Sequence, residues 1–303
     1  MTKQILKTTT VPNYVHSADC KELRARFDKI IDELIASSLS AEALKDALSG
    51  GIEKVGTILR SIPGHEGRLL ERGIAMIARC NPDLIVLTQN LRLPVTPTAL
   101  QLVGMNSPEH YRSLTLDADH GGRRTYTPDL IILNKQTKVA HVVDVKRSLI
   151  SYENTRIDEL KNRMLAAALV VPDLLFKEHR RLVAEEVRAV ILSAEERKCD
   201  VEGGIWPLSH LAYLIEVTGA GEAIGLLKES FEDRINKNWE IARQTFTRPP
   251  NLNSDQPVVS IAGEEDAEPD DEDVQNDGED AVAEAHSEPR LIKLGFAKVP
   301  LRH

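Results

Sequence analysis

Two short apolar runs, each containing a single aspartate, lie in the middle of the chain and restrict its fold more than any other feature. Residues 127–146 read TPDLIILNKQTKVAHVVDVK, so the runs flank the polar turn NKQT. Apolar runs rich in β-branched residues and joined by a short polar turn predict a β-hairpin. We therefore expect strands at 125–133 and 139–146, with Asp129 in the first strand and Asp144 in the second.

The side chains of Asp144 and Lys146 are predicted to share one face of the second strand with Ala140 and Val142, because alternate residues of a strand point the same way. The hairpin would also bring Asp129 close to Asp144. An ionised carboxylate in an apolar layer is costly unless it is paired or binds a metal, and two such carboxylates repel each other. A divalent cation relieves both costs, and oxygen-only ligands favour Mg²⁺ or Mn²⁺.

Two acids and a lysine around a divalent cation indicate the hydrolysis of a phosphodiester. The cation would polarise a phosphoryl oxygen and help to generate hydroxide from water. The lysine ammonium would add compact positive charge beside the scissile phosphate or position the attacking water.

Pro128-Asp129, followed after fifteen residues by Asp144-Val145-Lys146, resembles the PD-(D/E)XK signature of the restriction-endonuclease-like nucleases. The patterns around the signature predict a helix, three strands, a helix and a strand, an order similar to the common core of that superfamily. The resemblance implies an α/β fold and covers roughly residues 63–195. It also implies that Asp129, Asp144 and the Val145 carbonyl bind Mg²⁺ or Mn²⁺, with Lys146 as the charge-stabilising or water-positioning residue.

Such nucleases usually add an acid from the helix before the first strand, and two glutamates compete for this role. Glu66 lies near the centre of the apolar stripe of a helix predicted to start at Pro63. Glu71 lies on a neighbouring face with Gly64 and Gly67, where small side chains would let the helix approach the sheet. The string GRLLERGI is also similar to the family pattern. We favour Glu71 as the catalytic acid and metal ligand, with Glu66 as its alternate.

Basic residues near the hairpin are candidates for contacts with nucleic acid. Arg123 and Arg124 end the loop HGGRR before the first strand, and Arg147 directly follows Lys146. Arg163, on the helix expected at about 155–171, is a further candidate. Arginine side chains commonly bind phosphate groups, although the same residues also suit an ordinary solvated surface. The resemblance implies double-stranded DNA as the partner, with a homodimer as one arrangement for cutting both strands.

The charge of the chain is unevenly distributed. Residues 264–289 contain thirteen of the 47 acids and no Lys or Arg, whereas residues 290–303 contain four of the 38 bases and no acid. Residues 1–263 therefore have 34 acids and 34 bases, so the net charge of −9 excludes no polyanionic partner. The acidic stretch predicts a disordered segment that solubilises the chain, covers the chain's own basic cleft or recruits a basic protein.

The cysteines and the apolar content indicate the compartment. Cys20, Cys80 and Cys199 form no CxxC pair, which favours a reducing cytoplasm over a disulfide-linked or zinc-binding protein. No apolar run approaches the roughly 18 residues that span a bilayer, so we expect no membrane association.

The sequence thus predicts four parts: an N-terminal helical region (1–62), a PD-(D/E)XK nuclease-like domain (63–249), an acidic disordered linker (250–289) and a short basic and apolar C-terminal segment (290–303) that docks on the rest. The expected activity is that of a Mg²⁺- or Mn²⁺-dependent DNA endonuclease, in defence and restriction or in repair and recombination. The alternative is a catalytically inactive module of the same fold that binds DNA or a protein partner.

Overall fold

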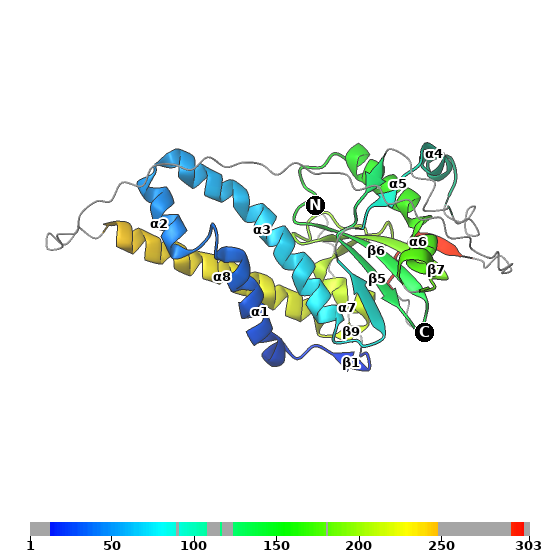
Figure 1. Ribbon diagram of the computed structural model, residues 1–303, viewed down its shortest axis with the longest axis horizontal. Helices are drawn as coiled ribbons and strands as arrows, with labels where there is room; N and C mark the ends of the chain where they lie inside the picture. Colours follow the sequence, from blue (N-terminus) through cyan, green and yellow to red (C-terminus); the bar gives the residue numbers. More distant parts are fainter. Residues whose placement is uncertain are drawn as a thin grey trace, which may run out of the picture.

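The computed structural model describes residues 13–88, 91–107, 116, 124–179, 181–247 and 292–299. Helices cover both faces of a mixed sheet, which gives an α/β fold in three layers (Figure 1). The loop residues His120 to Arg123 and the acidic stretch at 250–289 lie outside the described residues.

The sheet has six strands: β2 (Leu84–Leu87), β5 (Leu130–Asn134), β6 (Val139–Lys146), β7 (Glu186–Ser193), β8 (Ile205–Pro207) and β10 (Lys293–Phe296). Their order is β10-β7-β6-β5-β2, with β8 also paired to β7. β5 is antiparallel to both β2 and β6, whereas β6 runs parallel to β7. The predicted hairpin is therefore confirmed, and it lies at the centre of the sheet.

Two shorter strand pairs lie outside this sheet. β1 (His16–Ser17) pairs with β9 (Val217–Thr218) in parallel, and β3 (Leu93–Pro94) pairs with β4 (Thr125–Tyr126) in the antiparallel sense. The strand expected at 125–133 is divided in this way between β4 and β5, because only β5 joins the main sheet. Asp129 lies at a bend directly before β5.

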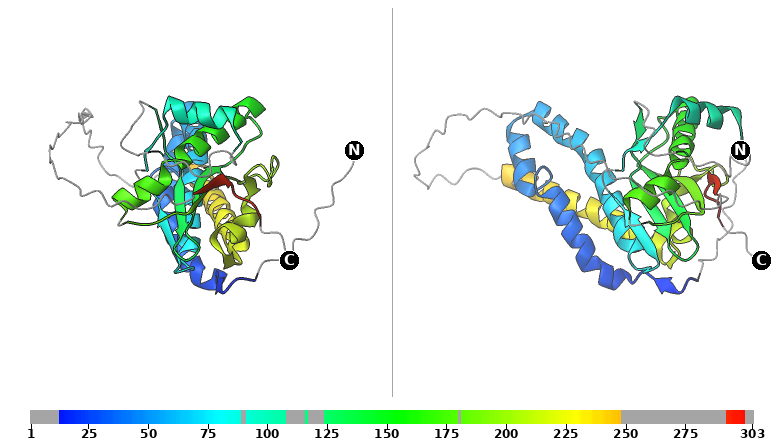
Figure 2. Two further views of the ribbon diagram at one scale, coloured as in Figure 1. Left: turned by 90° about the vertical axis from the view of Figure 1, so that its right-hand side faces the viewer. Right: turned by 45° about the vertical axis from the view of Figure 1, so that its right-hand side comes forward.

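One face of the sheet is covered by α1 (Cys20–Ile35), α3 (Ile52–Ala78), α7 (Leu211–Ile215) and α8 (Ala220–Thr247). α2 (Ala41–Ser49) packs against α3 and α8, and together these helices extend beyond the sheet as an arm (Figures 1 and 2). α4 (Pro97–Met105), α5 (Asn154–Ala168) and α6 (Val171–Glu178) cover the other face. No helix in these described ranges combines the length and apolarity needed to cross a bilayer.

The N-terminal helical region expected at 1–62 contains α1, α2 and the first part of α3. Ser40 caps α2 by accepting a hydrogen bond from the Ala43 N–H, and Gly51, at a φ of +87°, separates α2 from α3. The prediction that a new helix starts at Pro63 is wrong, because α3 is continuous through this residue. The proline leaves the carbonyl of Leu59 without its helical partner, and the half-exposed position of Leu59 gives that carbonyl access to water. The boundary expected at residue 62 therefore falls inside α3.

The C-terminal segment, which was predicted to dock on the rest of the chain, forms a strand of the sheet. β10 pairs in parallel with the first half of β7, and Leu294 is buried among the residues of the α5 side. The Phe296 ring lies so close to Gly204 that a Cβ there would come within 2.6 Å of Cδ1 of the ring. β10 and β8 thus share the same edge of β7.

Candidate active site

Asp129 and Asp144 face each other across the β5–β6 hairpin. The register pairs Leu130 with Val143, and its continuation sets Asp129 opposite Asp144. Asp129 forms a bend directly before β5, and its N–H donates to the Val143 carbonyl at 3.1 Å. The Val145 N–H donates to Oδ2 of Asp129 at 2.6 Å. The prediction that the hairpin brings the two acids together is confirmed.

The two faces of β6 are divided as the period of two predicts. Ala140 and Val142 pack in the core on the α5 side, whereas Val143 and Val145 pack in the core on the α3 and α8 side. Asp144 therefore belongs to the α5 side, where it is only 3% exposed. Because Asp144 is buried on an apolar face, its carboxylate needs polar partners in place of water.

Two side chains contact the Asp144 carboxylate. The Tyr126 hydroxyl donates a 2.7 Å hydrogen bond to Oδ2, and the Lys146 ammonium forms an ion pair with Oδ1. Oδ1 is fully buried and accepts no hydrogen bond of ordinary geometry from the part of the chain that the structure describes. The ion pair with Lys146 is therefore the contact that offsets the buried charge at Oδ1.

The acids at the end of the hairpin shift the pKa values of their neighbours. Burial raises the pKa of Asp129, the Asp144 carboxylate raises it further, and the Val145 N–H and Lys146 offset part of the rise. Burial lowers the pKa of Lys146, but the carboxylates of Asp144 and Asp129 outweigh it, so the net shift is upward. Lys146 thus stays cationic while Asp129 is destabilised as an anion.

Glu71, on α3, lies within electrostatic range of this cluster. Its pKa is raised to about 7 by burial first and then by Asp129 and Asp144, against the opposing effects of Lys146 and Arg68. Three carboxylates from α3, the start of β5 and the end of β6 therefore repel one another around a single lysine. We call Glu71, Asp129, Asp144 and Lys146 the acidic cluster.

Glu66, the alternate to Glu71, has a different environment. Its carboxylate Oε1 lies 3.6 Å from the Lys228 ammonium of α8, in a position that is only 9% exposed. The charges of Asp129, Asp144 and Lys146 shift the pKa of Glu71. Glu66 is not among the charges that shift the pKa of Glu71, Asp129 or Lys146. The structure thus places Glu71 beside the two aspartates and places Glu66 against α8.

The expected reason for the position of Glu71 is not what the structure shows. Cβ atoms added at Gly64 or Gly67 would have no atom within 4 Å, so these glycines face open space and do not pack on the sheet. The close approach of α3 is at Gly73, where an added Cβ would lie 2.2 Å from Cδ2 of Leu227 in α8. Glycine therefore fits α3 against α8 at position 73, and the glycines at 64 and 67 do not account for the position of Glu71.

The donor chemistry of the acidic cluster fits a hard divalent cation. All three acids offer oxygen, Oδ1 of Asp144 is buried without a hydrogen bond, and the mutual repulsion of the carboxylates would be relieved by a dication. Across residues 13–88, 91–107, 116, 124–179, 181–247 and 292–299, no three His, Cys, Asp or Glu side chains lie in an arrangement that could hold a metal ion. Val145 has a definite role through its N–H, and a role for its carbonyl as a ligand stays a prediction.

The predicted nucleic-acid contacts are only partly visible. Arg123 lies outside the described residues, and Arg124 is exposed directly before β4. Arg147 follows Lys146 at the surface, where its Nη1 lies 3.8 Å from the Glu195 carboxylate. Arg163, on α5, lies near enough to Tyr126 that its positive charge opposes part of the rise in the pKa of the Tyr126 hydroxyl. Arg147 thus adjoins the cluster residue Lys146, and Arg163 lies within electrostatic range of Tyr126.

Tyr126 is a site residue that the sequence patterns did not identify. It is 6% exposed, and its strand β4 is held by β3, where Leu93 is its register partner. Burial, and next the charge of Asp144, raises the pKa of the Tyr126 hydroxyl far above its usual value, so the group is a hydrogen-bond donor. Its place three residues before Asp129, in the string TYTPD, was the available signal.

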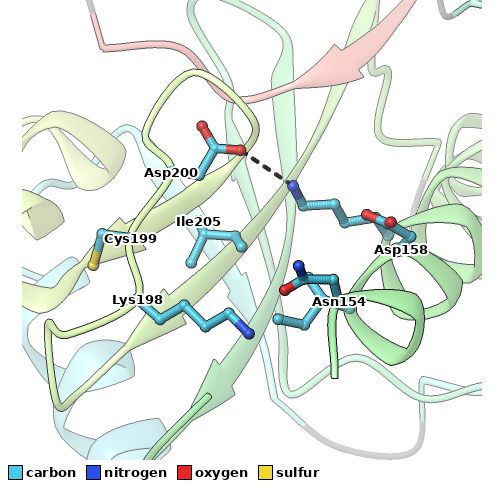
Figure 3. Close-up of a pocket in the computed structure, with 8 residues that line it drawn as sticks. Asn154, Asp158, Lys198, Cys199, Asp200 and Ile205 are labelled. Atoms are coloured by element: carbon cyan, nitrogen blue, oxygen red, sulfur yellow. Dashed lines mark ion pairs between the residues drawn. The ribbon is translucent and has the colours of Figure 1, made fainter. Parts of the chain in front are cut away.

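A separate pocket of about 280 Å³ lies between the start of α5 and the segment that follows β7 (Figure 3). The ion pair between Lys161 and Asp200, at 3.5 Å, spans it. Lys198, which lines the pocket, donates a hydrogen bond to the Tyr152 carbonyl. The pocket lining contains no member of the acidic cluster.

No family model, no curated protein and no solved structure matches this chain, so the functional interpretation depends on its residues and their geometry.

Proposed function

We propose that this chain is a metal-dependent nuclease of the PD-(D/E)XK, restriction-endonuclease-like superfamily that hydrolyses phosphodiester bonds in DNA. The main support is the acidic cluster, in which Glu71, Asp129, Asp144 and Lys146 interact electrostatically at one end of the β5–β6 hairpin. The order of elements α3, β2, β5, β6, α5 and β7, with β6 parallel to β7, is also compatible with the core of that superfamily.

Each residue of the cluster has a role in this proposal. Glu71, Asp129 and Asp144, together with the Val145 carbonyl, would hold Mg²⁺ or Mn²⁺. When bound, the cation supplies Lewis acidity at a phosphoryl oxygen and lowers the pKa of the attacking water. Lys146, which keeps its charge beside Asp144, stabilises the negative charge of the transition state or orients that water. Arg124 and Arg147 would bind flanking phosphates.

One observation favours a second candidate, a catalytically inactive module of the same fold that binds DNA or a protein. Lys146 forms an ion pair with Oδ1 of Asp144, so this buried carboxylate has a positive partner without a metal. A protein that had lost catalysis would be stable with such a pair. The exposed arginines around the cluster would serve binding in either case.

A cleavage assay separates the two functions. Supercoiled plasmid, linear single-stranded DNA and RNA would be incubated with the full-length chain and Mg²⁺, Mn²⁺ or EDTA. We expect metal-dependent cutting of DNA in the wild type and a loss of at least about 100-fold in Asp144→Ala and Lys146→Ala, because each removes a group that acts in the transition state. Lys135→Ala, an exposed lysine in the turn at the other end of the hairpin, is the matched control and should cut normally.

Two other outcomes would contradict the nuclease proposal. Equal residual cutting by wild type, Asp144→Ala and Lys146→Ala would identify a contaminating enzyme. DNA binding that all three proteins share, with no cutting by any of them, would support the binding module instead.

A further inference from the structure

In each aspartate of the hairpin, Oδ2 accepts a hydrogen bond from a donor of the protein itself. Oδ2 of Asp129 accepts the 2.6 Å hydrogen bond from the Val145 N–H. Oδ2 of Asp144 accepts the 2.7 Å hydrogen bond from the Tyr126 hydroxyl. Oδ1 of Asp144 accepts no hydrogen bond of ordinary geometry from the described residues and is paired with the Lys146 ammonium, whose place a dication would take.

The donor to Asp144 is held firmly in place. Tyr126 belongs to β4, which pairs with β3, and the Val95 N–H donates to the carbonyl of neighbouring Arg124 at 2.8 Å. The Tyr126 ring packs in the apolar core that includes Leu93 and Leu149. The hydroxyl therefore points at Asp144 from a rigid support, and the carboxylate cannot rotate without losing a buried hydrogen bond.

The number of oxygens that a carboxylate offers separates small dications from large ones. Ca²⁺ takes six to eight oxygens at about 2.3–2.6 Å and often binds both oxygens of one carboxylate, whereas Mg²⁺ requires a compact octahedron at about 2.0–2.1 Å. A carboxylate with one oxygen committed to a strong hydrogen bond can bind an ion through its other oxygen only, which suits Mg²⁺ better than Ca²⁺. The partners that orient metal ligands commonly change metal affinity by about 10–100-fold when they are removed.

We propose that Tyr126 is a positioning residue that restricts Asp144 to ligation through Oδ1 and thereby makes the acidic cluster select Mg²⁺ or Mn²⁺ over Ca²⁺. This inference rests on the metal site of the proposed function and adds its ion selectivity. Asp129 is restricted in the same way by a backbone donor, which no side-chain substitution removes. Tyr126 is thus the position at which the selectivity can be changed.

The test measures ion binding to the full-length chain in the absence of nucleic acid. The dissociation constant for Mn²⁺ would be obtained from the electron paramagnetic resonance signal of free Mn²⁺, and that for Ca²⁺ from its displacement of Mn²⁺. We expect the ratio of the Ca²⁺ constant to the Mn²⁺ constant to fall by about tenfold in Tyr126→Phe, because Oδ2 of Asp144 becomes available for bidentate binding. Tyr213→Phe removes a hydroxyl outside the cluster and should leave the ratio unchanged.

The outcomes distinguish this inference from the proposed function. If wild type and Tyr126→Phe have the same ratio within about twofold, the role of Tyr126 is refuted while the metal site stands. If wild type binds no Mn²⁺, or if Asp144→Ala binds Mn²⁺ as tightly as wild type, the role of Tyr126 and the proposed metal site are both refuted. Tyr126→Leu, a second variant without a donor, must show the same change in ratio as Tyr126→Phe, which separates loss of the donor from a local change in packing.

Discussion

The Val145 N–H donates a 2.6 Å hydrogen bond to Oδ2 of Asp129, so a side chain at the start of β5 takes the place of a backbone acceptor for β6. Val145 is 8% exposed, and a buried N–H without an acceptor is costly. Asp129 therefore has a structural role in joining the two strands as well as a proposed role as a metal ligand. The two roles can be separated, because only the second requires a negative charge.

The first prediction compares Asp129→Asn with Asp129→Ala. The asparagine retains an oxygen acceptor for Val145, whereas the alanine leaves the N–H unpaired at a cost of about 1–3 kcal/mol. We expect Asp129→Ala to be less stable than Asp129→Asn by that amount in urea unfolding with EDTA. Both variants remove the repulsion with Asp144, so it cancels in the comparison. Equal stabilities of the two variants would show that the hydrogen bond from Val145 does not contribute to stability. In the cleavage assay, both variants should lack metal-dependent cutting, because both lack the negative charge of Asp129.

The second prediction concerns the pH dependence of stability in EDTA. The pKa of Glu71 is raised in the folded chain from 4.5 to about 7, so the folded state binds the proton more tightly than the unfolded state. The stabilising effect of this neutral carboxyl is complete below about pH 4.5 and is lost as the pH rises through about 7. Glu71→Gln stays neutral throughout and should lack this loss.

Solvent screening at the partly exposed Glu71 reduces the effect to on the order of 1 kcal/mol, or roughly 2–4 °C in Tm. The measurement compares the fall in Tm between pH 5 and pH 8 for wild type, Glu71→Gln and Glu53→Gln, an exposed control on the same helix. Parallel curves for wild type and Glu71→Gln would refute the raised pKa. Addition of Mg²⁺ at pH 8 should raise the Tm of wild type and Glu53→Gln more than that of Glu71→Gln, because the ion binds the ionised form of Glu71.

Local patterns were sufficient for the parts of the structure in which one face is buried. The period of two in VVDVK placed Asp144 with Ala140 and Val142 on one face of β6 and Val143 with Val145 on the other, as the structure shows. The Ser40 cap and the glycines before α3 have the same origin, since capping and positive φ depend on neighbouring residues. The opposition of Asp129 and Asp144 follows from the short turn between their strands.

Long-range packing decided the features that the sequence did not reveal. α3 continues through Pro63 because tertiary contacts of the helix, such as Ile58 and Ile62 against the core, outweigh one lost hydrogen bond. Tyr126 reaches Asp144 only because β3, from more than thirty residues earlier, holds β4 in place. Likewise, no local signal shows that Glu66 meets Lys228, which lies on a helix far along the chain.

The third prediction distinguishes the two glutamates of α3. If the proposed function is correct, Glu71→Gln should lower metal-dependent cleavage by at least about 100-fold, because it removes a charged ligand from the cation. Glu66→Gln should retain cleavage within a few-fold and should instead lose stability, because Lys228 is left without its buried partner. The measurements are initial cutting rates and urea unfolding of the same preparations. Loss of cleavage in Glu66→Gln with normal cleavage in Glu71→Gln would reverse the assignment.

The position of β10 determines how the acidic stretch can be tested. α8 starts beside the segment after β8, where Gly221 contacts the Ser209 carbonyl, and its 28 residues extend roughly 42 Å along the arm (Figure 1). Thr247 therefore lies at the far end of the arm, whereas β10 is paired with β7 at the edge of the sheet. Deletion of residues 254–289 would leave nine residues between α8 and β10, which reach at most about 32 Å, and would pull β10 from the sheet.

The fourth prediction therefore keeps the length and removes only the charge. In the test variant the thirteen acids of residues 264–289 become Asn or Gln, while β10 and the length of its 45-residue connection to α8 are unchanged. If these acids compete with DNA for the arginines near the cluster, the variant should bind DNA about tenfold more tightly at 20 mM salt. The difference should vanish near 0.5 M salt, where charges are screened within a few ångströms. Equal affinities at low salt would leave the stretch as a solubilising segment, and equal Tm values would confirm that β10 remains docked.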